Sequence, residues 1–159
     1  MSWQRHCASD QETQRAGEEL AGTLRSGDIV LLSGQLGAGK TTFVKGVARG
    51  LGVLERVTSP TFTMVRPHQC HNNQGITTLL HADVYRVESL AEVLDLALGE
   101  LVEESAVALI EWGDLASSLF GREVLKIQFQ IDEHEGRVLD IDGALAVGRG
   151  GELDRWAAK

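Results

Sequence analysis

The sequence predicts an α/β fold in which helices flank a mainly parallel central sheet, with an antiparallel hairpin towards the C-terminus. Three observations support this prediction. Apolar, strand-like segments alternate with segments of helical periodicity along most of the chain. A glycine-rich loop stands between one such strand and one such helix. Finally, two short alternating segments follow each other across a polar turn, which is typical of a hairpin.

The first predicted helix begins at Ser9. Ser9 and Glu12 form a capping box, in which each side chain can accept a hydrogen bond from a free N–H group of the first turn. Apolar residues from Ala16 to Leu24 share one face of this helix, and Gly27 ends it.

The next elements surround the glycine loop. Residues 28–33 predict a buried strand, and residues 42–51 predict a helix that stops at Gly52. Between them, residues 34–41 match the phosphate-binding pattern G-x-x-x-x-G-K-[ST] at every required position. A chance match in a chain of this length has odds on the order of 1%. The predicted fold is therefore P-loop NTPase-like.

The remaining elements follow from alternation and from turn residues. We expect a single domain over residues 1–143 and a glycine-rich tail over 144–159, whose order the sequence leaves open. Further strands are predicted at 57–65, 77–85 and 107–112, the hairpin strands at 124–131 and 138–141, a turn at 67–75, and helices at 90–104 and 115–120.

Composition limits the possible functions. The 159 residues carry a net charge of −8, which argues against a protein that binds nucleic acid by itself. No apolar run approaches the ~20 residues of a membrane span, so no membrane association is expected. The N-terminal residues lack the apolar stretch of a signal peptide, and two cysteines make no disulfide framework. We therefore expect a cytoplasmic protein.

The glycine loop predicts a site for nucleoside triphosphates. Backbone N–H groups of residues 37–39 (Gly37, Ala38 and Gly39) can surround an anion, assisted by the positive end of the following helix. Lys40 is expected to reach the β- and γ-phosphates, and the Thr41 hydroxyl is expected to bind Mg²⁺. Thr42 can add a hydroxyl or an N–H group on the α-phosphate side.

Two acids end predicted strands at the same edge of the sheet. Glu111 ends an apolar strand, as a Walker B acid does, and is a candidate Mg²⁺ ligand; otherwise it is an exposed strand-end acid. Asp83 can orient a water molecule, or it merely caps the turn before Arg86. The candidate catalytic residues are therefore Lys40, Asp83 and Glu111.

Three further features leave alternatives open. Residues 58–61 either sense the γ-phosphate or form a proline-stiffened strand entry. Trp112 stacks on a nucleotide or a partner, or belongs to the core. Residues 68–71 contain two histidines and a cysteine and lie near His81, yet no fourth zinc ligand is evident.

Four segments together make the chain similar to the TsaE family, small ATPases of bacterial tRNA threonylcarbamoyladenosine synthesis. The first, Leu32–Phe43, is generic to P-loop proteins, whereas the order and spacing of the other three are specific to the family. One departure is Ala82, where an aromatic residue is common. The three specific segments are Val57–Thr63, His81–Arg86 and Ile110–Asp114.

The resemblance implies roles for particular residues. ATP phosphates would be held by Lys40 and the loop, and Mg²⁺ by Thr41 and Glu111. Asp83 and Trp112 match positions important for ATP turnover. The remaining implied nucleotide contacts are Ser9 and Thr13, near the adenine, and Arg137.

The resemblance also implies partners. In this family the TsaD protein, paired with TsaB, transfers the threonylcarbamoyl group to tRNA, and ATP hydrolysis by TsaE resets that pair. Alternatives are a small-molecule P-loop kinase, a nucleotide-dependent binding switch, or a scaffold with an inert loop. Between Val87 and Gly121 there are eight acids and no lysine or arginine, which disfavours the arginine-bearing lid of a kinase. The asparagines, Asn72 and Asn73, are misplaced for guanine selection.

Overall fold

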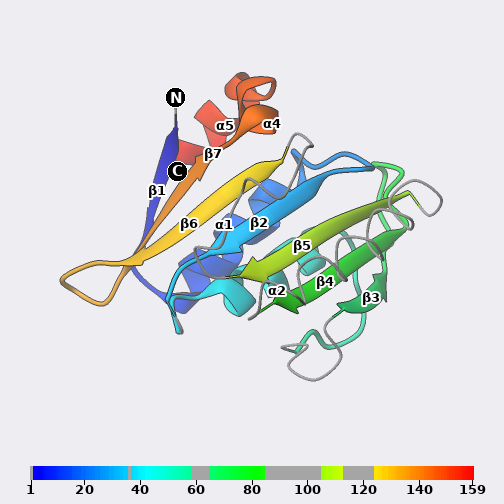
Figure 1. The fold of residues 1–159 in the computed structure, drawn as a ribbon, viewed down its shortest axis with the longest axis horizontal. Helices are drawn as coiled ribbons and strands as arrows, with labels where there is room; N and C mark the ends of the chain where they lie inside the picture. The colour runs from blue at the N-terminus through cyan, green and yellow to red at the C-terminus, as the bar shows by residue number, and fades with distance from the viewer. Residues whose placement is uncertain (1, 36, 59–64, 85–104, 113–123) are drawn as a thin grey trace.

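The computed structural model describes residues 2–35, 37–58, 65–84, 105–112 and 124–159. Within these ranges, seven strands form one sheet, and Figure 1 shows α1 and α2 together on one of its faces. The strands are β1 (Trp3–Cys7), β2 (Ile29–Ser33), β3 (Val65–Gln69), β4 (Thr78–Val84), β5 (Ala106–Trp112), β6 (Leu125–Ile131) and β7 (Arg137–Asp142). The helices are α1 (Asp10–Ala21), α2 (Lys40–Gly50), α4 (Ala144–Val147) and α5 (Gly150–Ala157).

The sheet is mixed, with a parallel centre. Its order is β1-β7-β6-β2-β5-β4-β3, in which β6, β2, β5 and β4 are parallel neighbours. The outer strands β1, β7 and β3 pair antiparallel with their neighbours, and β6 and β7 form the predicted hairpin. The α/β class and the parallel centre are therefore confirmed. The carboxyl ends of β2, β4 and β5 lie at one edge, where ligands bind in such sheets.

The two helices on the sheet pack with their backbones in close contact. A Cβ atom built on Gly46 of α2 would lie 1.9 Å from the carbonyl oxygen of Gln14 in α1. A Cβ atom on Gly17 of α1 would lie 2.3 Å from the carbonyl oxygen of Phe43 in α2. Side chains at these positions would push the helices apart, so glycine fixes how α2 lies against α1.

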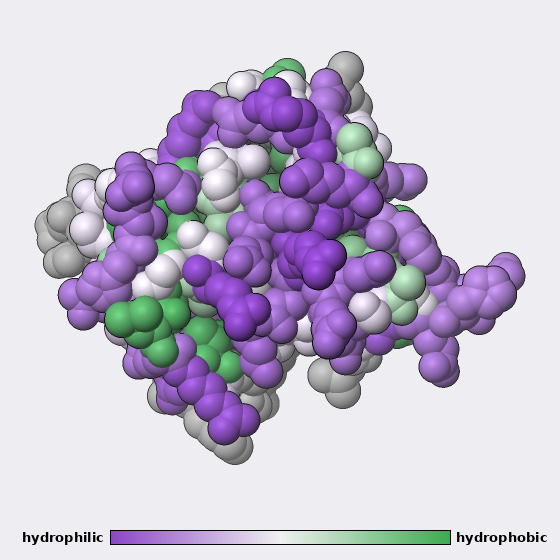
Figure 2. Space-filling view, turned by 180° about the vertical axis from the view of Figure 1, so that it is seen from behind, coloured by the Kyte–Doolittle hydropathy of each residue, from purple (hydrophilic) through white to green (hydrophobic). Residues whose placement is uncertain are grey.

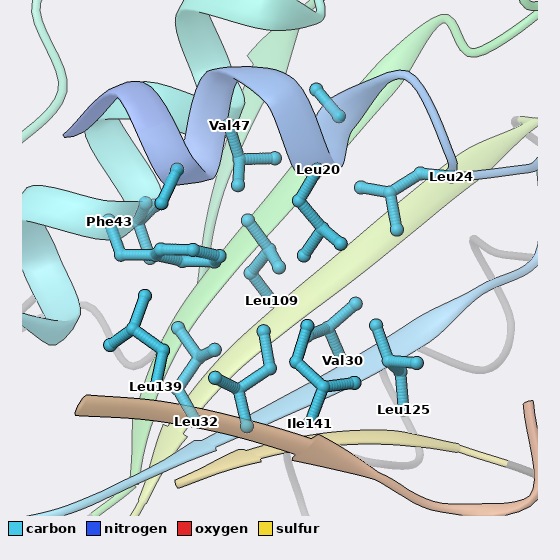
Figure 3. Packing of buried hydrophobic residues seen from close by; sticks show 14 of the residues in the cluster. Leu20, Leu24, Val30, Leu32, Phe43, Val47, Leu109, Leu125, Leu139 and Ile141 are labelled. Carbon is cyan, nitrogen blue, oxygen red and sulfur yellow. The ribbon is translucent and has the colours of Figure 1, made fainter. Parts of the chain in front are cut away.

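The hydrophobic core lies between these helices and the sheet (Figure 3). Inward-facing residues alternate along β2 because side chains of a strand point to opposite faces in turn. The buried side chains that converge here are Leu20 and Leu24 of α1, Phe43 and Val47 of α2, Val30 and Leu32 of β2, Leu109 of β5, Leu125 of β6, and Leu139 and Ile141 of β7.

Two strands differ from the sequence prediction. Of the strand predicted over 57–65, residues 59–64 lie outside the described residues, as do the predicted helices at 90–104 and 115–120, and Val57 and Thr58 are not in a strand. Val65 begins β3 (Val65–Gln69), which occupies part of the predicted turn. Pro67 suggested a turn, but β3 is an edge strand, where a residue without an N–H group is tolerated. Strand β1 was not predicted, because Arg5 occupies one of its inward positions.

The C-terminal residues, whose order the sequence left open, form α4 and α5 beside β1 and β7 (Figure 1). Trp156 of α5 donates from Nε1 to the carbonyl oxygen of Ala16 at 2.9 Å. The Arg5 guanidinium lies 5.5 Å from the centroid of the Trp156 ring. On β1, Trp3 Nε1 donates to Asp154 at 2.8 Å. These contacts tie the last helix to the first strand and to α1.

A buried ion pair also joins this C-terminal segment to the sheet. Arg149, between α4 and α5, contacts both carboxylate oxygens of Asp28, at 2.8 Å for the Nη2–Oδ1 pair. Asp28 immediately precedes β2, and both residues are buried. Arg149 also donates to the carbonyl oxygen of Thr23 at 3.2 Å, so the guanidinium links three parts of the chain.

The helix-bearing face is largely hydrophilic, with a small hydrophobic group near one edge (Figure 2). Among the described residues, Leu54 is the most exposed large hydrophobic side chain. Within the residues that the structure describes, no helix has both the length and the apolar character needed to cross a membrane.

Candidate functional site

The glycine loop connects the end of β2 to the start of α2. Its glycines have left-handed backbone angles, with φ of +80° at Gly37 and +97° at Gly39. A side chain at Gly37 would have free space, so the conformation rather than crowding requires glycine there. Leu36, within the loop, lies outside the described residues. The strand, loop and helix predicted from the sequence are therefore present in this order.

The N-terminus of α2 carries the groups that suit an anion. The first N–H groups of a helix have no partners within the helix, and the helix dipole makes this end positive. Lys40 begins α2, and its Nζ donates to the carbonyl oxygen of Gly34 at 2.7 Å, across the loop. Thr41 and Thr42 follow, both half-buried beside the same cleft.

Thr41 and Glu111 meet at the carboxyl edge of the sheet. The Thr41 hydroxyl donates to Glu111 Oε1 at 2.9 Å, and its distance to Oε2 is 3.3 Å. Glu111 is 4% exposed, so its carboxylate is buried rather than an exposed strand-end acid. A hydroxyl and a carboxylate are oxygen ligands of the kind that Mg²⁺ prefers. The two predicted metal ligands are thus adjacent, although their role as ligands stays a prediction.

His81 lies against the same carboxylate, a contact that was not predicted from the sequence. Its Nε2 hydrogen-bonds to Glu111 Oε2, and since a carboxylate only accepts, the ring donates. His81 is fully buried on β4, two residues before Asp83 and therefore on the same face of the strand. That two-residue spacing was the available signal, whereas the sequence suggested only a zinc role for His81.

Asp83 lies beside Glu111, since the two residues are partners in the register of β4 and β5. Burial raises the pKa of the Asp83 carboxyl, and the charge of Glu111 raises it further, while Lys40 and His81 act in the opposite direction. A carboxyl with a raised pKa is better matched to proton transfer near neutral pH.

These groups surround a cleft of about 350 Å³, within the range of small-molecule sites. Both signs of charge face it, as a site for a phosphate ester with a divalent cation requires. The lining residues are Asp10, Gly37, Gly39, Lys40, Thr41, Thr42, Asp83, Glu111 and Arg137.

Two predicted adenine contacts do not line this cleft. The Ser9 hydroxyl accepts a hydrogen bond from the N–H group of Glu12 at 3.2 Å, and so caps α1 as predicted. Thr13 is 1% exposed, and its hydroxyl donates to the carbonyl oxygen of Ser9. Asp10 lines the cleft instead, and it lies within the stretch from Ser9 to Thr13 that the family resemblance places near the adenine. The adenine contacts of Ser9 and Thr13 stay predictions.

Several other predicted features are described only in part. Trp112 is the last residue of β5, and its contact with a nucleotide or a partner stays a prediction. Arg86 and residues 59–61 lie outside the described residues. In the stretch considered for zinc, His68 Nδ1 pairs with Glu55 at 2.6 Å. Over the described ranges, no three histidine, cysteine or acidic residues are grouped so as to hold a metal ion.

Comparisons with known proteins agree with this geometry. The family model described as "Threonylcarbamoyl adenosine biosynthesis protein TsaE" matches residues 7–139. A protein of Treponema pallidum named "tRNA threonylcarbamoyladenosine biosynthesis protein TsaE" is 41% identical over 77% of this chain and 87% of its own length. A Streptomyces coelicolor protein of the same name is 39% identical over 89% of this chain and 91% of its own.

A solved structure extends the likeness to three dimensions. The crystal structure of Bacillus subtilis YdiB superposes with a TM-score of 0.75 at 29% identity, covering 98% of this chain and 95% of that one. The family model spans the loop, Asp83 and Glu111 and ends within β7. The chain therefore belongs to the TsaE family.

Proposed function

We propose that this chain is the ATP-hydrolysing component of tRNA threonylcarbamoyladenosine biosynthesis in the cytoplasm, and that it acts on the TsaB–TsaD pair to support repeated turnover. The pathway is the one named in the family description and in the relatives' names. The observation that carries the activity is the meeting of Thr41 and Glu111 at the end of the phosphate loop, 2.9 Å apart. A glycine loop that bound no nucleotide would not need a buried carboxylate beside the Thr41 hydroxyl.

The residues present fit Mg²⁺ together with ATP. Thr41 and Glu111 offer the oxygen ligands, and His81 holds the Glu111 carboxylate in place. When bound, Mg²⁺ supplies positive charge that offsets the charge on the phosphate oxygens. Lys40 and the N–H groups at the start of α2 bind the phosphates and orient them.

Asp83 is the stronger candidate for orienting the attacking water. The Glu111 carboxylate already accepts hydrogen bonds from Thr41 and His81. Asp83 lines the same cleft, is only half-buried, and has a pKa raised by burial and by the charge of Glu111. It can accept a hydrogen bond from water and so direct an oxygen lone pair at the γ-phosphorus.

Replacing Asp83 with asparagine separates this role from binding. We expect ATP affinity to stay within a few-fold, while turnover falls by roughly 10²–10⁴, the usual contribution of a general base. The nucleotide-free protein should also become more stable at pH 7, because a raised pKa means that folding disfavours the ionised carboxylate. This gain should vanish below the ordinary pKa of aspartate, where the wild-type carboxyl is protonated in both states.

Calorimetric binding, steady-state turnover and thermal unfolding at pH 7 and pH 3 would measure these effects. Asp142→Asn, at the exposed end of β7, is the matched control and should change none of them. Retained turnover in Asp83→Asn would remove Asp83 from the mechanism.

The central test of the proposed function is whether ATP hydrolysis by the chain depends on the TsaB–TsaD pair. A net charge of −8 suits a component that leaves tRNA to its partners. The described residues that line the cleft include one arginine, Arg137, and its guanidinium is engaged with backbone carbonyl groups. We therefore expect slow Mg-ATP hydrolysis by the chain alone, because charge stabilisation of the transition state is incomplete.

The experiment is steady-state phosphate release by the purified chain, alone and with the TsaB–TsaD pair. Strong stimulation by the pair is the expected result. No stimulation, together with transfer of phosphate to a small metabolite, would make the chain a kinase and contradict the proposed function.

A further inference from the structure

The Arg137 guanidinium donates hydrogen bonds to backbone carbonyl groups of two segments, the phosphate loop and the turn before β7. On the loop side, Nε donates to the carbonyl oxygen of Ala38 and Nη2 to that of Gly37, each at 3.1 Å. On the hairpin side, Nη1 donates to the carbonyl oxygens of Glu135 at 2.6 Å and Gly136 at 3.2 Å. Two hydrogen bonds thus join Arg137 to the phosphate loop, and two hold its guanidinium against the turn before β7.

These contacts bear on the direction of the loop N–H groups. In a planar trans peptide the C=O and the next N–H point in opposite directions. Because the Ala38 carbonyl is held towards Arg137, the N–H group of Gly39 points away from it. The preceding peptide is held at both ends, since the N–H group of Ala38 also donates to the carbonyl oxygen of Gln35 at 3.1 Å.

The loop needs such a restraint because glycine flanks these carbonyls on both sides. Gly37 and Gly39 both have left-handed φ angles, and glycine has many other conformations to adopt when nothing holds it. Ordering a flexible loop at the moment of binding lowers affinity, whereas a loop ordered beforehand avoids that loss.

Arg137 itself is held in place by an ordered turn. Asp132 Oδ1 accepts hydrogen bonds from the N–H groups of His134 and Gly136, both at 2.8 Å. Arg137 begins β7, where it pairs in register with Cys7 of β1 and Ile131 of β6. Its backbone is thus fixed by strands on both sides, which suits a residue that positions others.

We propose that Arg137 is a positioning residue that holds the phosphate loop in its anion-binding shape before any nucleotide arrives. This inference rests on the proposed nucleotide-binding function. It assigns Arg137 a role different from the direct nucleotide contact implied by family resemblance. We expect Arg137 to affect how tightly the loop binds the phosphate groups of the ligand, whichever nucleoside they carry.

The test compares Arg137→Lys and Arg137→Gln with wild type. Affinities for Mg-ATP and for inorganic tripolyphosphate with Mg²⁺ are measured by calorimetry, and amide NMR spectra of residues 37–39 are recorded without ligand. Arg25→Gln is the matched control, since Arg25 is exposed and precedes the far end of β2.

We expect both variants to lose affinity for both ligands by a similar factor, roughly ten- to a hundredfold. Lysine should not restore binding, because a single ammonium group cannot reproduce the fork of a guanidinium. The Ala38 and Gly39 amide signals should shift or broaden without ligand, and thermal unfolding should change little.

Three results would overturn the inference. A loss of affinity confined to ATP would make Arg137 a nucleoside contact, and wild-type affinity in Arg137→Lys would reduce its role to charge. Unchanged ligand-free spectra would show that Arg137 does not hold the loop in shape. If wild-type protein bound neither ligand, the proposed function would fail instead. The ligand-free spectra would still decide whether Arg137 shapes the loop.

Discussion

Replacing Lys40 with alanine is expected to lower affinity for Mg-ATP by roughly a hundredfold or more, as loss of a charged donor to phosphate implies. Lys40 begins α2, lines the cleft, and is held over the loop by its hydrogen bond to Gly34. The remaining N–H groups of the helix start provide only partial charges, so they do not replace the ammonium. Calorimetric titration with Mg-ATP measures the effect.

The chain offers a matched control on the same helix. Lys45 is exposed on α2 and does not line the cleft, so Lys45→Ala removes the same charge at a different place. This variant should bind Mg-ATP as the wild type does. Both variants should unfold at about the wild-type temperature without nucleotide. Wild-type affinity in Lys40→Ala would overturn the assignment of the phosphate loop.

Replacing Arg149 with methionine is expected to give the largest loss of stability, about 3–5 kcal/mol in free energy of unfolding. The change removes the guanidinium that contacts both oxygens of Asp28 and leaves a buried carboxylate without its counter-ion. The N–H group of Arg25 still donates to Asp28 at 2.8 Å, but it carries no full charge. Urea unfolding followed by circular dichroism measures the effect.

Two variants separate the ion pair from the rest of the C-terminal segment. Arg155→Met removes an exposed arginine from α5 and should cost little. Adding Asp28→Asn to Arg149→Met should recover much of the loss, because the uncompensated charge is then gone. If Arg149→Met were as stable as Arg155→Met, the buried pair would have no part in holding the C-terminal helices on the sheet.

The elements that sequence predicts well are those whose signal is local. The loop, its strand and its helix are specified within one stretch of chain, and the Ser9 side chain caps the first helix as expected, although Glu12 accepts from the N–H group of Ala8 rather than that of Ser9. By contrast, β1 was missed because Arg5 faces inwards, where a 2.6 Å ion pair with Glu19 and a contact with the Trp156 ring compensate its burial. The order of α5 depends on contacts of Trp156 with distant parts of the chain.

The same distinction applies to the site. Parallel strands that end in acids predict where Asp83 and Glu111 lie, and the register places them side by side. The contact of His81 with Glu111 depends on which face of β4 is buried, and that is set by tertiary packing. Arg137 donates to carbonyl groups about a hundred residues away in the sequence. Because every residue has a backbone carbonyl group, the sequence does not show which of them accepts a hydrogen bond.

The packing of the last helix against the first strand also determines what the protein's intrinsic fluorescence reports. Of the three tryptophans, Trp3 and Trp156 are both buried where the two ends of the chain meet, each with its indole N–H bonded. Trp112 is the tryptophan that is next to a cleft residue in the sequence, because it directly follows Glu111 in β5. Emission from Trp3 and Trp156 during denaturation therefore reports the docking of α5. A Trp3→Phe, Trp156→Phe protein is the suitable background for an optical signal from Trp112, beside the nucleotide site.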